Sequence, residues 1–224
     1  MKYAALCKQL GYQFAQSQLL QRALTHRSFS ATHNERLEFL GDSVLNCTIA
    51  KYLYQTYPDL PEGDLSRLRS NLVNQQTLAI LAQQMNLGDQ LLLGEGERKS
   101  AGSRRPSILA DALEALFGAV MLDADFAAAE KVVLGLYVPF IAGTDPQTLG
   151  KDAKTLLQEY LQGRKLALPK YNVVEILGEA HAQTFVVSCE VAQLGLTTNG
   201  EGASRRIAEQ IAAERAFQQI KDNP

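Results

Sequence analysis

The spacing of the apolar residues changes near residue 150, and this change limits the folds that the chain can adopt. Before it, apolar residues recur every three or four positions, for example in residues 37–54 and 108–123, which is the period of a helix that buries one face. After it, the apolar residues of 184–191 alternate along the chain, which is the period of a half-buried strand. The sequence therefore predicts two domains of different class, joined by the linker-like residues 142–151.

Residues 1–140 predict a succession of helices without a hairpin. Pro58 and Pro61 interrupt the helical period, which resumes after them. A later helical pattern at residues 76–88 is expected to stop at Gly88. Residues 91–107 are rich in Gly, Ser and Arg, so we expect a loop there.

Residues 152–222 predict a helix, three strands and a helix. Asp152 is a suitable N-cap for the first helix, and Gly163 is a suitable stop. The expected elements are a helix at 152–163, strands at 169–177, 183–191 and 195–202, the last being the weakest, and a closing helix at 204–220. Ala208, Ala212 and Ala216 form one stripe of the closing helix.

The composition excludes several classes of protein. Of 224 residues, 46% are hydrophobic and the net charge is −2, so a core is available and any nucleic-acid site must be a local patch. Three dispersed cysteines argue against a disulfide framework and fit a reducing cytosol. No signal-like N-terminus and no apolar run of roughly 20 residues is present. We expect a cytoplasmic protein with no membrane span.

Three acids begin a helical stripe that then turns apolar. Glu35, Glu38 and Asp42 lie on one narrow face of the predicted helix, and Leu45 and Ile49 continue the same stripe. Like charges at this spacing destabilise a helix by about 0.2–0.5 kcal/mol, and partial desolvation increases that cost. Neither a solvated face nor a core face explains this pattern.

A second apolar helix repeats the arrangement with Asp111 and Glu114. If the two helices meet, the crowded carboxylates either take up protons or bind a divalent cation. Oxygen ligands without His or Cys select a hard cation such as Mg²⁺, and Gly41 and Gly118 would allow close approach. The spacing leaves another reading open, in which the acids lie on a wet helix end or pair with nearby arginines, namely Arg36, Arg67 or Arg69.

Several motifs resemble those of bacterial ribonuclease III. They are HNERLEFLGDSVL at 33–45, LTHRS at 24–28 and SILADALEALFGAV at 107–120. In the second part, LQEYLQG, GEAHAQTFVV and GASRRIAEQIAAERA resemble a double-stranded-RNA-binding domain. The resemblance implies an α+β multidomain protein: an all-α ribonuclease III endonuclease domain at 1–145, followed by an α-β-β-β-α double-stranded-RNA-binding domain at 152–222.

The resemblance also assigns roles to the acids. Glu38, Asp111 and Glu114 would ligate Mg²⁺, for which Mn²⁺ can substitute, and Asp42 and Glu114 would be catalytic. The remaining acids that match family positions near the scissile bond are Glu35 and Glu62, which are accessory candidates. His26 and Arg27 are expected to be structural.

Four residues of the second domain are candidate RNA contacts. Duplex RNA is recognised across its minor groove through 2′-hydroxyl and phosphate groups, which suits Gln158 and His181. Arg205 and Arg206 begin the closing helix, where guanidinium groups and the helix N-terminus favour phosphate. Many such domains carry a further basic residue beside this pair or four positions after its first member, where this chain has Ile207 and Glu209.

The resemblance implies a homodimeric, Mg²⁺-dependent endonuclease that cuts double-stranded RNA to staggered products with 5′-phosphate and 3′-hydroxyl ends. Its expected roles are ribosomal-RNA precursor processing and mRNA processing and decay, and no nucleotide cofactor is expected. The rival reading is a non-catalytic duplex-RNA binder with structural acids. An enzyme acting on DNA is disfavoured, because the 2′-hydroxyl distinguishes RNA from DNA.

Overall fold

The computed structural model describes residues 3–142, 150–179 and 183–222, and the chain divides into two compact units, residues 1–149 and 150–224. The first unit is helical in its described residues, and a single bridge pairs Thr25 with Leu92. Its elements are α1 (Ala4–Leu10), α2 (Ser17–Ala23), α3 (Glu35–Thr56), α4 (Glu62–Leu72), α5 (Gln75–Gln84), η1 (Leu87–Gln90), α6 (Glu95–Lys99), η2 (Gly102–Arg104), α7 (Pro106–Asp123) and α8 (Phe126–Ala142).

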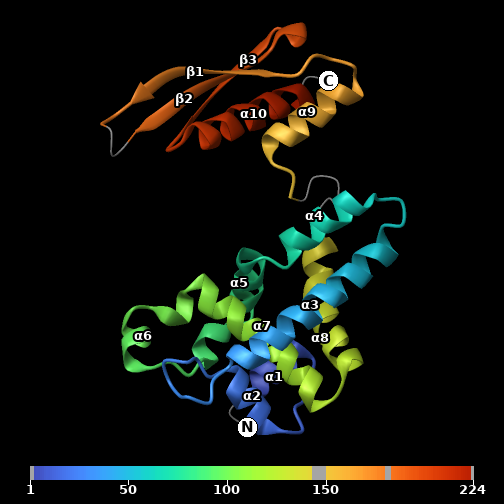
Figure 1. Ribbon diagram of the computed structural model, residues 1–224, viewed down its shortest axis with the longest axis vertical. Helices are drawn as coiled ribbons and strands as arrows, with labels where there is room; N and C mark the ends of the chain where they lie inside the picture. The colour runs from blue at the N-terminus through green and yellow to red at the C-terminus, as the bar shows by residue number, and fades with distance from the viewer. Residues whose placement is uncertain (1–2, 143–149, 180–182, 223–224) are drawn as a thin grey trace. The chain divides into compact units, whose positions relative to one another are not determined.

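Helices α3 and α7 pack against each other in the middle of the first unit (Figure 1). Leu113 and Phe117 on α7 and Leu45 on α3 are fully buried. A Cβ built at Gly41 would overlap the carbonyl oxygen of Glu114, and one built at Gly118 would overlap that of Leu37. Two glycines therefore bring the two helix backbones into direct contact.

Two details of the first unit differ from the sequence prediction. Helix α5 ends at Gln84 rather than Gly88, because Asn86 takes a left-handed conformation, with φ 51°, and residues 87–90 form a 3-10 turn. The predicted loop at 91–107 contains α6 and η2. Helix α6 has acids in its first turn and bases in its last, which complements the helix dipole.

The second unit has the predicted order of helix, three strands and helix. Its elements are α9 (Ala153–Gly163), β1 (Lys170–Leu177), β2 (Thr184–Val191), η3 (Ala192–Leu194), β3 (Leu196–Gly202) and α10 (Arg205–Asp222). The strands form one antiparallel sheet in the order β1-β2-β3, and α9 and α10 lie on one face of it (Figure 1). The predicted fold class, all-α followed by α-β-β-β-α, is confirmed.

The core of the second unit follows the predicted periods. Val187, Cys189 and Val191 on β2 are buried, while Glu190 between them is exposed. The three alanines of the predicted α10 stripe have no exposed surface. Two of them, Ala212 and Ala216, pack with Leu157 and Leu161 of α9. Asp152 is the N-cap of α9 and accepts a hydrogen bond from the Thr155 N–H at 2.9 Å.

Within the described residues, no helix has the length and apolar character that a bilayer crossing requires.

Candidate metal centre and RNA-facing residues

The α3–α7 crossing brings acids from both helices together. One carboxylate oxygen from each of Glu38, Asp111 and Glu114 lies within 4.8 Å of the others, and all three residues are partly buried. No ion pair in the described part of the chain engages any of these three side chains. Arg67, one of the candidate partners, pairs with Asp64 on its own helix at 2.9 Å. Glu38 of α3 therefore meets both acids of α7 in one pocket.

Asp42 stands slightly apart from this triad. It is exposed, and its carboxylate accepts a hydrogen bond from the Asn46 side-chain amide at 2.7 Å. The same amide donates to the Asp42 backbone carbonyl at 3.0 Å. Asn46 thus fixes the Asp42 side chain one helical turn along α3, near enough for its charge to act on the triad but outside the group of candidate ligands.

The triad holds more negative charge than its surroundings balance. Burial, and after it the nearby carboxylates of Asp42 and Glu38, together raise the pKa of Glu114 to about 8. Burial and the charge of Asp111 raise the pKa of Glu38 as well. The pKa of Asp111 is also raised by burial, although His26 and Arg27 act in the opposite direction. A divalent cation bound by these oxygens would remove the repulsion.

The donor set fits a hard cation. Three carboxylates from two rigid helices supply oxygen atoms only, which Mg²⁺ and Mn²⁺ accept. Three protein ligands also leave coordination positions for water and for phosphate oxygens. The arrangement therefore has the composition of a metal-dependent phosphodiester-cleaving centre.

A polar rim borders the triad on the α2–α3 side. Arg27 contacts Glu35 at 3.3 Å, so the accessory candidate Glu35 is held beside a cation. The His26 ring accepts a hydrogen bond from the Ser28 N–H at 3.2 Å, and the Ser28 hydroxyl accepts one from the Gly94 N–H at 3.0 Å. His26 and Arg27 also line the acidic centre.

Glu62 does not join the triad of its own chain. It opens α4 and accepts a hydrogen bond from the Ser66 hydroxyl at 2.6 Å. With Tyr54, near the end of α3, it lines a shallow cavity. Glu38 and Tyr54 are separated by sixteen positions on α3, or about 24 Å of helix.

The RNA-facing candidates of the second unit lie on α9 and α10. Gln158, Arg205 and Arg206 are exposed, and the Ser204 hydroxyl accepts from the Ile207 N–H at 3.3 Å, which caps the α10 N-terminus. His181 lies outside the described residues.

Glu209, four positions after Arg205 on α10, contacts two cationic side chains. It accepts from Lys154 on α9 at 2.6 Å and from the Arg205 Nε at 2.8 Å, and the Lys154 hydrogen bond is the main cause of its lowered pKa. Lys154 also lies 4.4 Å from the centre of the Tyr171 ring. Sequence reasoning missed Lys154, because a contact between residues 55 positions apart leaves no local signal.

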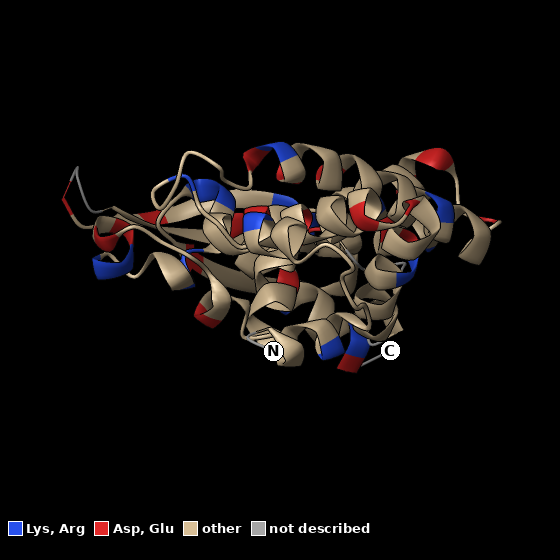
Figure 2. Cartoon of the chain, turned by 90° about the horizontal axis from the view of Figure 1, so that it is seen from below, with Lys and Arg blue, Asp and Glu red and all other residues tan. Residues whose placement is uncertain are grey.

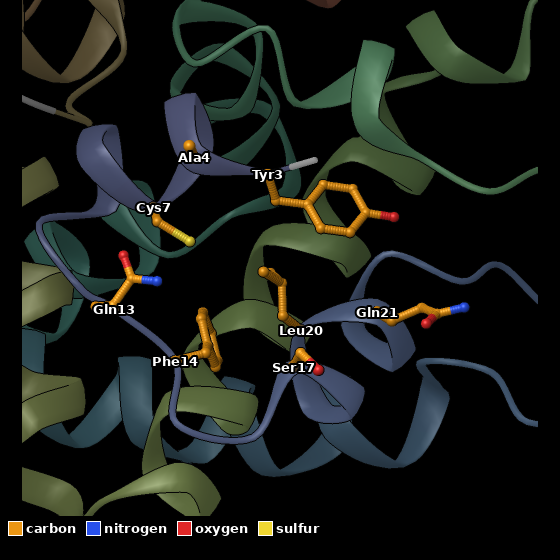
Figure 3. Close-up of a pocket in the computed structure, with 8 residues that line it drawn as sticks. All are labelled: Tyr3, Ala4, Cys7, Gln13, Phe14, Ser17, Leu20 and Gln21. Carbon is orange, nitrogen blue, oxygen red and sulfur yellow. The ribbon is translucent and has the colours of Figure 1, made fainter. Parts of the chain in front are cut away.

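The charged residues and the cavities are both distributed as expected for an acidic site that is confined to the α3–α7 crossing. Acidic and basic residues are interspersed along the chain in Figure 2, so the acidic centre is a local feature. A separate cavity of about 270 Å³ lies between α1 and α2 (Figure 3), and the described residues that line it include no carboxylate and no cationic group. Burial raises the pKa of the Cys7 thiol in its wall, which makes that group a poor metal ligand.

Two family models match the two units. The model described as Ribonuclease-III-like matches residues 16–140, and the model described as double-stranded RNA binding motif matches residues 153–220. Ribonuclease 3 of Cupriavidus taiwanensis is 60% identical over 221 residues, which cover 99% of this chain and 86% of that protein. Ribonuclease 3 of Thiobacillus denitrificans is 60% identical over 218 residues, covering 97% of this chain and 96% of that protein.

Solved structures resemble the first unit. The nuclease domain of Ribonuclease III from Campylobacter jejuni matches with a TM-score of 0.60 and 44% identity, over 63% of this chain and 97% of that chain. A second structure of that domain, described as having structural flexibility in a region involved in dimer formation, matches with a TM-score of 0.59 and 45% identity. It covers 60% of this chain and 94% of that chain.

Proposed function

Because the chain is a ribonuclease of the ribonuclease III family, we propose that it is a Mg²⁺-dependent endonuclease that cuts double-stranded RNA. The meeting of Glu38, Asp111 and Glu114 at the α3–α7 crossing is the observation that carries this proposal. Residues 1–145 form the catalytic domain, and residues 152–222 form the RNA-binding domain. The protein acts in the cytoplasm.

The metal-binding residues in this proposal are Glu38, Asp111 and Glu114. A cation bound there would lower the pKa of the attacking water and would stabilise the negative charge on the phosphate oxygens. The half-buried position of the three carboxylates excludes bulk water from their inner side and holds their oxygens in place. Asp42, fixed by Asn46, adds negative charge at the edge of the site and is available as an acceptor for a proton from water.

The cleavage products follow from which bond breaks. Water oxygen forms a new bond to phosphorus, and the bond between phosphorus and the 3′-oxygen breaks. The departing 3′-oxygen gains a proton, and the phosphate stays on the 5′ end of the other fragment. Duplex cleavage to staggered ends requires two such centres, one for each strand.

A homodimer supplies the second centre. The Campylobacter nuclease domain, described with a dimer-forming region, supports this assembly. Phe39 and Tyr54 on α3 are 79% and 74% exposed. They are fifteen positions apart, so their directions around the helix differ by about 60°, and we assign both aromatic side chains to the subunit contact. Because Glu62 is distant from the acidic centre of its own chain, it can take part in the reaction only at the centre of the second subunit.

Duplex RNA is held by the second domain through Gln158, His181, Arg205 and Arg206. This assignment is supported by the exposed positions of Gln158, Arg205 and Arg206. Precursors of ribosomal RNA and structured messenger RNAs contain long duplexes, so their processing and decay are the proposed cellular roles.

A cleavage assay on the full chain tests the proposal. The substrate is a labelled RNA duplex longer than the roughly 16 base pairs that one RNA-binding domain covers, and a DNA duplex of the same sequence is the control. We expect paired cuts in RNA only, with Mg²⁺ or Mn²⁺ and not with a chelator. The 5′ ends should resist phosphorylation by a kinase until they are treated with phosphatase.

The rival reading makes a different prediction in the same assay. A non-catalytic binder would shift the RNA duplex on a gel and leave it uncut with either cation, at low salt as well as at moderate salt. Low salt matters because phosphate contacts weaken as salt increases.

A further inference from the structure

A polar cavity adjoins the acidic triad and is larger than a metal site needs. Its volume is about 540 Å³, and Glu38 and Asp111 belong both to its wall and to the triad. Protein sites for small organic groups have volumes of about 300–1,000 Å³. The cavity therefore has room for part of a nucleotide beside the proposed metal centre.

The charges of this cavity are divided between two sides. Glu38 and Asp111 form the side shared with the triad, and the side chains of His26, Arg27 and Arg105 contribute basic groups to the lining. The two further acids of the lining are each beside an arginine: Glu35 lies 3.3 Å from Arg27, and Glu97 lies 2.6 Å from Arg105. The acids left without a cationic partner are those proposed to hold the metal.

Arg105 is held in place by the α6–η2 segment. A Cβ at Gly102 would come within 2.6 Å of the Glu97 side chain, so the missing side chain at position 102 leaves the space that Glu97 fills. Glu97 contacts one terminal nitrogen of Arg105, and the other donates to the Ser100 hydroxyl at 3.4 Å. The Arg105 side chain is still 47% exposed, and a guanidinium has five N–H donors.

His26 offers another donor to the cavity. Its Nδ1 accepts the Ser28 N–H at 3.2 Å, so the neutral ring carries its proton on Nε2. Ser107, at the start of α7, adds a hydroxyl to the same lining. The basic side of the cavity thus presents donors, and the two carboxylates on that side, Glu35 and Glu97, are each engaged by an arginine.

We infer that this cavity binds a phosphate of the cleaved RNA strand next to the scissile bond, with Arg105 as its main contact. Arg27 and His26 are further donors. A guanidinium matches the oxygen geometry of a phosphate and makes paired, charge-assisted hydrogen bonds to it. A base edge or ribose would not need two arginines. The inference rests on the proposed function, because it assumes that the triad is where the strand is cut.

The test pairs Arg105→Gln with substrates in which one phosphate is neutral. Duplex RNAs carry a methylphosphonate at the linkage on the 5′ side or on the 3′ side of a mapped cut. In the wild-type protein, one of these replacements should lower kcat/KM by about tenfold to a hundredfold, the usual effect of losing a charged hydrogen bond. In Arg105→Gln, the unmodified substrate should show that loss, and the methylphosphonate should cause little further loss.

Arg104→Gln is the matched control, because Arg104 is an exposed neighbour that is not part of the cavity wall. It should behave like the wild-type protein with every substrate. Arg105→Lys keeps a point charge without the planar group and should be intermediate. Should Arg105→Gln fail to fold, Arg27→Gln gives the same comparison at a side chain that is 71% exposed.

Equal methylphosphonate penalties in the wild-type protein and in Arg105→Gln overturn the inference, as does equal loss in the Arg104 and Arg105 variants. The same substrates are also compared by equilibrium binding in Ca²⁺. If the wild-type protein cuts no RNA, the proposed function fails; binding of the unmodified duplex in Ca²⁺ by the wild-type, Arg105→Gln and Arg104→Gln proteins then decides whether Arg105 holds a phosphate.

Discussion

Gly41 on α3 lies directly against Glu114 on α7, so that the Glu114 carbonyl oxygen occupies the space that a side chain at position 41 would need. The contact is between a helix backbone and the segment that carries a candidate metal ligand. The geometry of the acidic centre therefore depends on the spacing of two main chains, and substitutions that separate them should affect stability and cleavage together.

Gly41→Ala should lower the free energy of unfolding by about 1–3 kcal/mol, as overpacking of a close contact does, and should reduce cleavage. Thermal unfolding and kcat measure the two effects. Gly63→Ala is the control, because a Cβ at this helical glycine would meet nothing within 4 Å. That variant should be neutral or slightly stabilised. If the Gly41→Ala protein is as stable and as active as the wild type, the close contact controls neither the stability nor the acidic centre.

The metal-free protein should become less stable as the pH rises from about 5 to 8. The pKa of Glu114 is raised to about 8 in the folded chain, so the folded state binds a proton that the unfolded state has already lost in this window. The loss of unfolding free energy should be on the order of 1–3 kcal/mol. Chemical denaturation in a chelator at several pH values measures it, and Mg²⁺ should reduce the slope. Glu114→Gln, which does not titrate, is the comparison.

Glu114→Ala should separate binding from chemistry. The substitution removes a candidate ligand and one negative charge, so cleavage should fall by orders of magnitude while the RNA contacts of the second unit remain. The helix should persist, since Ala is the better helix former. Thermal unfolding, a duplex-RNA gel shift and a cleavage assay on this one variant are decisive. Cleavage at the wild-type rate would exclude Glu114 from the mechanism.

Glu209→Gln should loosen the contact between α9 and α10. Lys154 and Arg205 both lose a charged acceptor whose side chain is only 11% exposed, and such hydrogen bonds contribute about 1.5–3 kcal/mol. Hydrogen exchange of the backbone amides in α9 and early α10 should become faster. Glu214→Gln, at an exposed position of the same helix, should leave the exchange unchanged; equal acceleration in both variants would argue against the Lys154–Glu209–Arg205 contact.

Phe39→Ser should weaken the proposed dimer. An aromatic residue that is 79% exposed in one chain and central to a subunit contact commonly contributes about 2 kcal/mol or more to binding, which is roughly a thirtyfold change in the dissociation constant. Sedimentation at several concentrations measures it, and paired cuts should decline with the dimer. Phe29→Ser is the control, since Phe29 is 53% exposed and outside α3. A monomeric wild-type protein that still makes paired cuts contradicts the two-centre scheme.

The periods of the sequence predicted the fold because each element buries a face that repeats along it. They could not predict that Asp111 and Glu114 meet Glu38, since spacing within a helix says nothing about which helices cross. Helix α6 was missed because its five residues are too few to show a helical period. Its Glu97 depends on contacts outside the helix, with the Arg105 side chain and with the backbone at Gly102, where a side chain would collide with it. The Asp42–Asn46 hydrogen bond, in contrast, joins residues at i and i+4, and the known helical pairing of such side chains could have indicated it.

The glycines of the helix crossing are reciprocal. Gly41 faces the Glu114 carbonyl, and Gly118 faces the Leu37 carbonyl. In an ordinary core contact, a larger residue on one helix can be offset over evolutionary time by a smaller residue on its neighbour. Neither position can become smaller, because each is already glycine, and the atoms opposite each glycine belong to the main chain, which no substitution can shorten. No compensating exchange of side chains is therefore available at this crossing, and a larger residue at position 41 or 118 would have to move one of the two helix backbones.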